Sequence, residues 1–145
     1  ILYEHHAKQA IQILKRLTKK AEKNNIIITL ETSLSAINIR TLINEVGSDN
    51  LKINFDLGNS CALGEITEHV IHELEDLIYS VHIKDRKRLF GTTVPLGKGD
   101  VNFVACFKSL KKINFKGDIV IQGARDRNDI KTAKKYLSFV RNLLK

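Results

Sequence analysis

Short apolar runs along the chain alternate with longer stretches in which apolar residues recur every three or four positions. This pattern predicts strands separated by helices. The strands are expected at Ile26–Glu31, Leu51–Asp56, Ser80–Lys84 and Gly117–Gln122. The helices are expected at Tyr3–Lys23, Ser35–Val46, Glu65–Tyr79, Asn102–Ile113 and Asp129–Leu144. The predicted order is therefore one helix followed by four strand–helix units.

The predicted strands are near-continuous apolar runs, which is typical of a parallel sheet covered by helices. The expected fold is therefore α/β, with four parallel strands and five helices. Neither a linker nor a low-complexity tract interrupts residues 1–145, which we take as a single domain. Four strand–helix units make half of a TIM (β/α)8 barrel, which typically takes about 250 residues. Because a half barrel has two open edges, we expect a carboxyl half that lacks its amino-terminal half barrel, a homo-oligomer, or an open doubly wound sheet.

Turn-forming residues mark several predicted boundaries. Ser35 is expected to cap the helix that it begins, and Gly47 lies just past the end of that helix. A long loop precedes the fourth helix and contains the sequence VPLGKGDVNF (Val94–Phe103). Its two glycines leave two interpretations. The backbone amides bind an anion at the helix start, or the loop is a turn followed by a helix cap from Asp100 or Asn102, which we favour.

Composition narrows the class of protein. Hydrophobic residues make up 43% and charged residues 28% of the 145 residues, as in a globular protein. No apolar run approaches the ~20 residues that span a bilayer, and the start ILYEHHAKQA does not resemble a signal peptide, so we expect no membrane partner. The absence of methionine, the initiator included, suggests a fragment or a processed product. The two cysteines, Cys61 and Cys106, suit the reducing cytoplasm.

The net charge of +8 arises from 24 lysines and arginines against 16 acidic residues. Such a charge suits a nucleic-acid or an anionic-substrate partner. The basic residues, however, lie off the apolar stripes of the predicted helices, and no aromatic residues are interleaved with them as a single-strand binder requires. We therefore interpret them as solvated helix faces and expect no nucleic-acid partner.

Three ionisable residues, Glu31, Asp56 and His82, lie at or near the ends of predicted strands. The carboxyl ends of parallel strands meet at one edge of the sheet, where α/β active sites form. These oxygen and nitrogen donors suit Mn²⁺, Mg²⁺, Co²⁺ or Zn²⁺ with open positions for a substrate. Such an ion stabilises an enediolate while Glu31 moves a proton between adjacent carbons. Each residue alone also fits an ion pair, a turn cap or a core histidine, but the three together favour a metal site.

Cationic residues follow the same strand ends. Lys84 has two interpretations, which we leave open: it binds a substrate phosphate or an enolate, or it forms an ion pair with Asp85 or Asp56. Further candidates for a substrate phosphate just past the strand ends are Arg86, Arg88 and Arg125.

Four segments together resemble a known family. They are ETS (Glu31–Ser33), FDLGNS (Phe55–Ser60), VHIKDR (Val81–Arg86) and VPLGKGDVNF (Val94–Phe103). The chain resembles the carboxyl half of the xylose isomerase-like TIM barrels, and within them the sugar-phosphate isomerases and epimerases of the hexulose-6-phosphate isomerase or L-ribulose-5-phosphate 3-epimerase kind. The resemblance covers essentially the whole chain, and the pairing of HIKD with GKGDVNF is its most specific part.

The resemblance implies a set of site residues. In the family, four strand-end residues, commonly Glu, Asp, His and Glu, bind a divalent metal, and the two glutamates also act as acid and base. By position these are Glu31, Asp56, His82 and Gln122. Gln122 departs from the family pattern, because an amide can ligate a metal but cannot accept a proton as a base. This places two-base epimerisation in doubt and leaves one-base isomerisation, an altered reaction or an inactive relative. Asn59 takes a position at which relatives contact substrate oxygens.

The expected function is a metal-dependent isomerase or epimerase for a small sugar or sugar phosphate. A second class, the endonuclease IV-like DNA repair enzymes, shares this barrel and would use the positive charge. That class requires further strand-end histidines for a multi-metal centre, and only His82 occupies such a position. A third class is a truncated, non-catalytic relative that binds a sugar or a partner, which the half barrel and Gln122 both favour.

Overall fold

The computed structural model describes residues 2–144 of the chain. Along the chain the elements are α1 (Leu2–Lys23), β1 (Ile28–Leu30), α2 (Ala36–Val46), β2 (Leu51–Asp56), α3 (Leu57–Ala62), α4 (Thr67–Glu73), β3 (Ile78–Ile83), β4 (Asp85–Arg86), β5 (Thr93–Val94), α5 (Phe103–Lys112), β6 (Asp118–Ile121) and α6 (Asp129–Leu143). The four predicted strands pair side by side in parallel, in the order β1-β2-β3-β6. The predicted α/β fold with a parallel sheet is confirmed.

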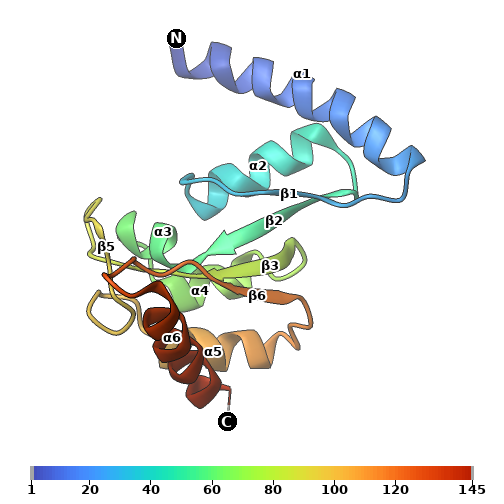
Figure 1. The fold of residues 1–145 in the computed structure, drawn as a ribbon. Helices are drawn as coiled ribbons and strands as arrows, with labels where there is room; N and C mark the ends of the chain where they lie inside the picture. The colour runs from blue at the N-terminus through green and yellow to red at the C-terminus, as the bar shows by residue number, and fades with distance from the viewer. Residues whose placement is uncertain (1, 145) are drawn as a thin grey trace.

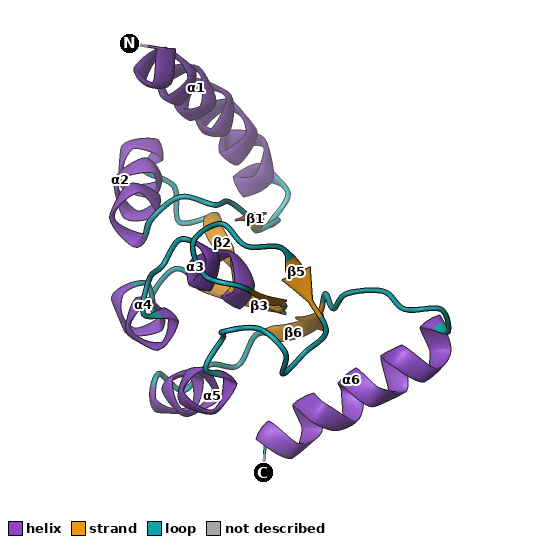
Figure 2. Cartoon of the chain, turned by 90° about the vertical axis from the view of Figure 1, so that its left-hand side faces the viewer, coloured by secondary structure: helices purple, strands orange, loops and turns teal. Residues whose placement is uncertain are grey.

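One face of the sheet is covered by helices and the other is polar. Helices α2, α4 and α5 lie along the covered face, whereas α1 lies beyond β1 and α6 beyond β6 (Figures 1 and 2). Side chains alternate between the two faces along each strand. The core residues of the two central strands are Leu51, Ile53, Phe55, Val81 and Ile83. The residues between them, such as Asn54 and His82, belong to the polar face, and they are the residues available for chemistry.

The edges of the sheet are β1 and β6, and each is paired on one side only. A closed barrel has no such edges, so the four strands form an open sheet. Across the described residues, no helix is both long enough and apolar enough to cross a membrane.

The segment between β2 and β3 differs from the sequence prediction. The helix expected at Glu65–Tyr79 is α4, which ends at Glu73 and is followed by turns. The chain has already reached the sheet at Leu77, whose carbonyl accepts a hydrogen bond from the Ile53 amide at 2.9 Å. The apolar spacing continues past α4 because Leu74 and Leu77 fill the core from a turn. Helix α3 is an additional element, and its six residues are too few to show a helical period.

The predicted helix boundaries at Gly47 and Asn102 are confirmed, whereas the predicted cap at Ser35 is replaced by another residue. Gly47 ends α2 in the left-handed conformation at φ 68°, and the Asn102 side chain caps α5 by accepting from the Ala105 amide. Ser35 occupies the N-cap position of α2 without a side-chain cap bond. Instead, Glu65 from the loop before α4 accepts from the Ala36 amide at 3.0 Å. A long-range partner of this kind leaves no local sequence pattern.

Candidate active site

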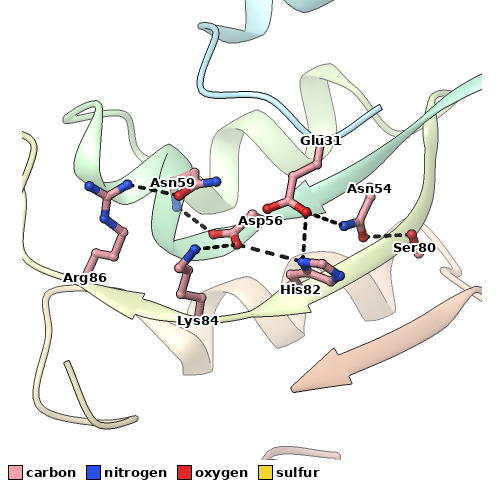
Figure 3. A network of polar contacts seen from close by, with 8 residues as sticks. All are labelled: Glu31, Asn54, Asp56, Asn59, Ser80, His82, Lys84 and Arg86. Carbon is pink, nitrogen blue, oxygen red and sulfur yellow. Dashed lines mark hydrogen bonds and ion pairs between the residues drawn. The ribbon is translucent and has the colours of Figure 1, made fainter. Parts of the chain in front are cut away.

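Three ionisable side chains meet at the carboxyl ends of neighbouring strands. Glu31 follows β1, Asp56 ends β2, and His82 lies one residue before the end of β3. One ligand atom from each lies within 4.8 Å of the others, and within the described residues this is the one such group of three. His82 Nδ1 lies 3.2 Å from Glu31 Oε2 and 4.0 Å from Asp56 Oδ2 (Figure 3). The structure therefore brings together the three residues that the sequence placed at strand ends.

An irregularity in β3 sets the register between the central strands. Ile53 of β2 lies beside Ile78 of β3, but the next residue, Asn54, lies beside Ser80. Strand β3 therefore contains one extra residue, Tyr79, at this point. A bulge of this kind re-aims the side chains that follow it, because side chains alternate with a period of two.

The bulge places His82 in the site. Beyond Tyr79, His82 lies beside Asp56 and faces the same side of the sheet. Before the bulge, Ile78 packs against the core instead. Gly117, just before β6, leaves room for this backbone, because a Cβ at that position would lie 2.0 Å from the Tyr79 carbonyl oxygen. The absence of a side chain at Gly117 therefore permits the local shape that aligns the site.

The two carboxylate oxygens of Asp56 have different surroundings. Oδ1 accepts a hydrogen bond from the Asn59 amide at 2.7 Å and so caps α3. Oδ2 is buried, as is His82 Nδ1, and neither has a hydrogen-bond partner in the part of the chain that the structure describes. Buried polar atoms without partners are costly. Two such atoms that converge with the Glu31 carboxylate fit a divalent cation, so the residues present suit the metal that the strand-end donors suggest.

Burial raises the pKa of the Asp56 carboxyl, although the bond from the Asn59 amide and the charges of Lys84 and His82 partly offset this effect. The ionised form of Asp56 is therefore disfavoured in the folded chain. Asp76 shows the opposite behaviour, because hydrogen bonds from the Arg40 guanidinium, at 2.7 and 3.2 Å, lower the pKa of its carboxyl. The pKa values of the two aspartates are therefore shifted in opposite directions, so the two residues can be compared directly by mutation.

We expect Asp56→Asn to raise the free energy of unfolding of the metal-free chain at pH 7, and Asp76→Asn to lower it by a few tenths of a kcal/mol at an exposed pair. Ionised Asp56 costs stability above its raised folded pKa, and that cost is absent below the unfolded pKa. Asp76 contributes stability above its unfolded pKa and loses it as pH falls through its lowered folded pKa. Urea unfolding at several pH values should show both differences shrinking towards acid. The same sign for both variants would contradict this electrostatic description.

Two polar residues beside the cluster have defined partners. Lys84 Nζ lies 3.6 Å from Asp56 Oδ2, which matches the ion-pair interpretation. The Asn59 side-chain oxygen accepts a hydrogen bond from Arg86 Nη1 at 3.0 Å (Figure 3). The NH₂ group of the Asn59 side chain is therefore the part that can donate a hydrogen bond to a ligand.

The other predicted site residues lie on the loops of the same edge. Gln122 follows β6 directly, and its backbone amide donates to the Ile83 carbonyl at 3.0 Å. Arg88 is exposed between β4 and β5. Arg125 is exposed beyond β6, in a groove beside α6. No contact joins the side chains of these three residues to the cluster in the described chain, and their roles stay predictions.

The glycine loop before α5 binds an anion that belongs to the chain itself. Asp85 is fully buried, and its Oδ2 accepts hydrogen bonds from the amides of Gly97 and Gly99, each at 2.8 Å. A Cβ at Gly99 would lie 1.9 Å from Asp85 Oδ1. This contact joins the HIKD segment to the GKGDVNF segment in the folded chain. The favoured interpretation is confirmed, because Asn102 caps the helix. The loop amides of Gly97 and Gly99 are occupied by the chain's own Asp85 carboxylate.

Sequence reasoning missed two residues that contact the cluster. Asn54 Nδ2 donates to Glu31 Oε2 at 3.2 Å, and the Ser80 hydroxyl donates to Asn54 Oδ1 at 2.7 Å (Figure 3). Asn54 is a polar residue inside an apolar strand, two positions before Asp56 and on the same face, and this placement could have identified it. Ser80 lies two positions before His82 on the same face, so the same reasoning could have identified it.

Comparisons with known proteins agree on one family. Residues 2–143 match the model of the family described as xylose isomerase-like TIM barrel. Over 73 residues the chain is 34% identical to the putative L-ribulose-5-phosphate 3-epimerase SgbU of Escherichia coli K12, a match that covers 46% of this chain and 26% of that protein. The chain spans about half the length of the curated relatives that it matches along most of its own length.

Solved structures show the same fold. A xylose isomerase domain protein from Planctomyces limnophilus superposes with a TM-score of 0.84 at 24% identity, over 94% of this chain and 53% of that one. The 3-keto-D-glucoside 4-epimerase YcjR from Escherichia coli superposes with a TM-score of 0.78 at 22% identity, over 94% of this chain and 53% of that one. The four parallel strands thus correspond to part of a TIM barrel.

Proposed function

Because the chain belongs to the xylose isomerase-like TIM barrel family, we propose that it carries the metal-binding and acid–base residues of a sugar isomerase or epimerase. The reaction moves a proton between adjacent carbons of a small sugar or sugar phosphate. The observation that supports this most is the convergence of Glu31, Asp56 and His82 at the carboxyl edge of the sheet. The sugar epimerases among the similar proteins point to the same class of substrate.

The metal would be held by Glu31, Asp56 and His82, with Gln122 as a fourth ligand through its amide oxygen. The donor set suits Mn²⁺, Mg²⁺, Co²⁺ or Zn²⁺. When bound, such an ion supplies a Lewis acid that polarises a sugar carbonyl.

Two residues of the chain have different roles in the proton transfer. Glu31 is the base that removes a proton from the hydroxyl-bearing carbon next to the carbonyl and delivers it to the carbonyl carbon. The hydroxyl proton of the first carbon passes to the former carbonyl oxygen, which becomes the new hydroxyl. The enediolate between these two steps carries negative charge, and the Lys84 ammonium beside Asp56 lies where it can neutralise that charge. Since Gln122 cannot accept a proton, we propose a one-base isomerisation rather than a two-base epimerisation.

Other polar residues at this edge suit the substrate oxygens. Asn59 donates from its side-chain amide to a sugar hydroxyl, since its oxygen is already bonded to Arg86. Arg88 and Arg125 are exposed on loops of the same edge, where a guanidinium suits a substrate phosphate. These assignments make a sugar phosphate the favoured substrate.

Ketose–aldose conversion tests the proposed reaction. We expect the chain, with Mn²⁺, to convert L-ribulose 5-phosphate or D-allulose to the isomeric aldose, as followed by proton NMR. Glu31→Gln should slow this conversion by at least about 100-fold, the usual contribution of a general base. Glu45→Gln, at an exposed position on α2, is the matched control. Conversion that survives in Glu31→Gln would remove Glu31 as the base, and no conversion by the Mn²⁺-loaded wild type would favour a non-catalytic relative.

A further inference from the structure

Glu31 needs a positioning partner, because the strand that precedes it is short and lies at the edge of the sheet. It follows β1, a three-residue edge strand that pairs only with β2. About a third of its side chain is exposed. A free glutamate samples several rotamers, and ordering one costs conformational entropy. The orientation of this carboxylate must therefore come from the side chains that contact it.

Asn54 supplies one such contact from the neighbouring strand. Its Nδ2 donates to Glu31 Oε2 at 3.2 Å. His82 Nδ1 approaches the same oxygen, also at 3.2 Å. Both contacts of the carboxylate in the described chain thus involve Oε2, which leaves Oε1 for a substrate proton.

Ser80 determines which end of the Asn54 amide faces Glu31. Its hydroxyl donates to Asn54 Oδ1 at 2.7 Å, and Figure 3 shows Ser80, Asn54 and Glu31 in a line that leads to His82. With its oxygen engaged by Ser80, the amide presents its N–H donors to the carboxylate. A reversed amide would place its oxygen against Oε2, where the two would repel each other.

The bulge at Tyr79 aligns this row of side chains. It places Ser80 beside Asn54, on the polar face of the sheet. Without the extra residue, Tyr79 would lie beside Asn54, and Ser80 would fall on the core side. The same backbone feature therefore aims His82 at the cluster and Ser80 at Asn54.

We propose that Asn54 is a positioning residue for Glu31, and that Ser80 acts through Asn54 by fixing the orientation of its amide. Together they hold Glu31 with Oε2 directed at the cluster and Oε1 open. The consequence for catalysis rests on the proposed function, whereas the orientation of Glu31 does not.

Mn²⁺ affinity provides the first test, with the metal alone as the probe. Residues behind metal ligands typically contribute 10–100-fold to affinity, so we expect Asn54→Leu to weaken Mn²⁺ binding by about 10-fold or more. Ser80→Ala should weaken it in the same direction, and Ser80→Thr, which keeps the hydroxyl, should restore it. Thr29→Ala, two residues before Glu31 and on the same face, is the matched control. Wild-type affinity in both Asn54→Leu and Ser80→Ala would overturn the proposal.

A second test requires no metal, and it separates this proposal from the proposed function. The side-chain N–H₂ signals of Asn54 in nitrogen–proton NMR spectra should be shifted and protected from exchange in the metal-free chain. Ser80→Ala and Glu31→Gln should each move them towards free-amide positions, with the fold checked by circular dichroism. Signals that neither substitution moves would overturn the proposal. Mn²⁺ binding that is absent from the wild type would defeat the proposed function, and the NMR result would still decide the role of Asn54.

Discussion

Replacing Asp85 with alanine is expected to lower the free energy of unfolding by about 3 kcal/mol, which is at the upper end of the usual range for one substitution. The Asp85 carboxylate is fully buried and accepts hydrogen bonds from the amides of Gly97 and Gly99 at 2.8 Å, with a longer bond from Val101 at 3.4 Å. Its removal leaves these backbone donors unpaired, and each such group costs about 1–3 kcal/mol. Urea unfolding followed by circular dichroism measures the difference.

Three further variants separate the buried contact from a general effect of charge. Asp85→Asn keeps an oxygen acceptor and should cost less than Asp85→Ala. Gly99→Ala should cost about as much as Asp85→Ala, because its Cβ would lie 1.9 Å from Asp85 Oδ1. Asp100→Ala removes a neighbouring carboxylate that pairs with Lys87 near the surface, and it should cost far less, because solvent screens exposed ion pairs. Equal losses for Asp85→Ala and Asp100→Ala would contradict the proposed role of the buried carboxylate.

His82→Ala and Asp56→Ala are each expected to reduce Mn²⁺ affinity at least about 100-fold while the fold survives. Each substitution removes one of three converging ligands, and for Asp56 and His82 the converging atom is buried without a hydrogen-bond partner among the described residues. Removing the charge of Asp56 costs the metal-free chain little, since burial already raises the pKa of this carboxyl. The loss of the α3 cap in Asp56→Ala costs about 1 kcal/mol. Calorimetric titration gives the affinities, and circular dichroism checks the fold.

His72→Ala is the matched control for histidine removal. His72 is exposed near the end of α4, so any contribution of surface histidines to Mn²⁺ binding would appear in this variant. The control should keep wild-type affinity. Unchanged affinity in both His82→Ala and Asp56→Ala would exclude the cluster as the metal site.

The strand pattern carried most of the information about the fold and the site. Strands of a parallel sheet end at a common edge, so Glu31 and Asp56 could be placed together from their positions at strand ends. His82 could be added because it lies in the next strand of the sheet. The four strands paired in the predicted parallel sheet, since apolar runs of this length are recognisable without tertiary information.

Features that depend on contacts between distant segments could not be predicted. The bulge at Tyr79 is set by pairing with β2 and by the space beside Gly117, and neither leaves a periodic pattern. In the same way, the anion bound by the glycine loop is Asp85, 12 and 14 residues before the amides that contact it. Glu65 replaces the local cap at Ser35 for the same reason. In both of these cases, a residue distant in the sequence forms the hydrogen bond, whereas the local sequence suggested another partner.

The most direct test of the account is calorimetric titration of Mn²⁺ into the purified chain, with and without ribulose 5-phosphate. We predict binding at one site, strengthened by the sugar phosphate, because the proposed metal ligands are Glu31, Asp56 and His82 and the proposed substrate site lies beside them. Absence of Mn²⁺ binding, or binding that the sugar phosphate leaves unchanged and that Asp56→Ala retains, would contradict the proposed function.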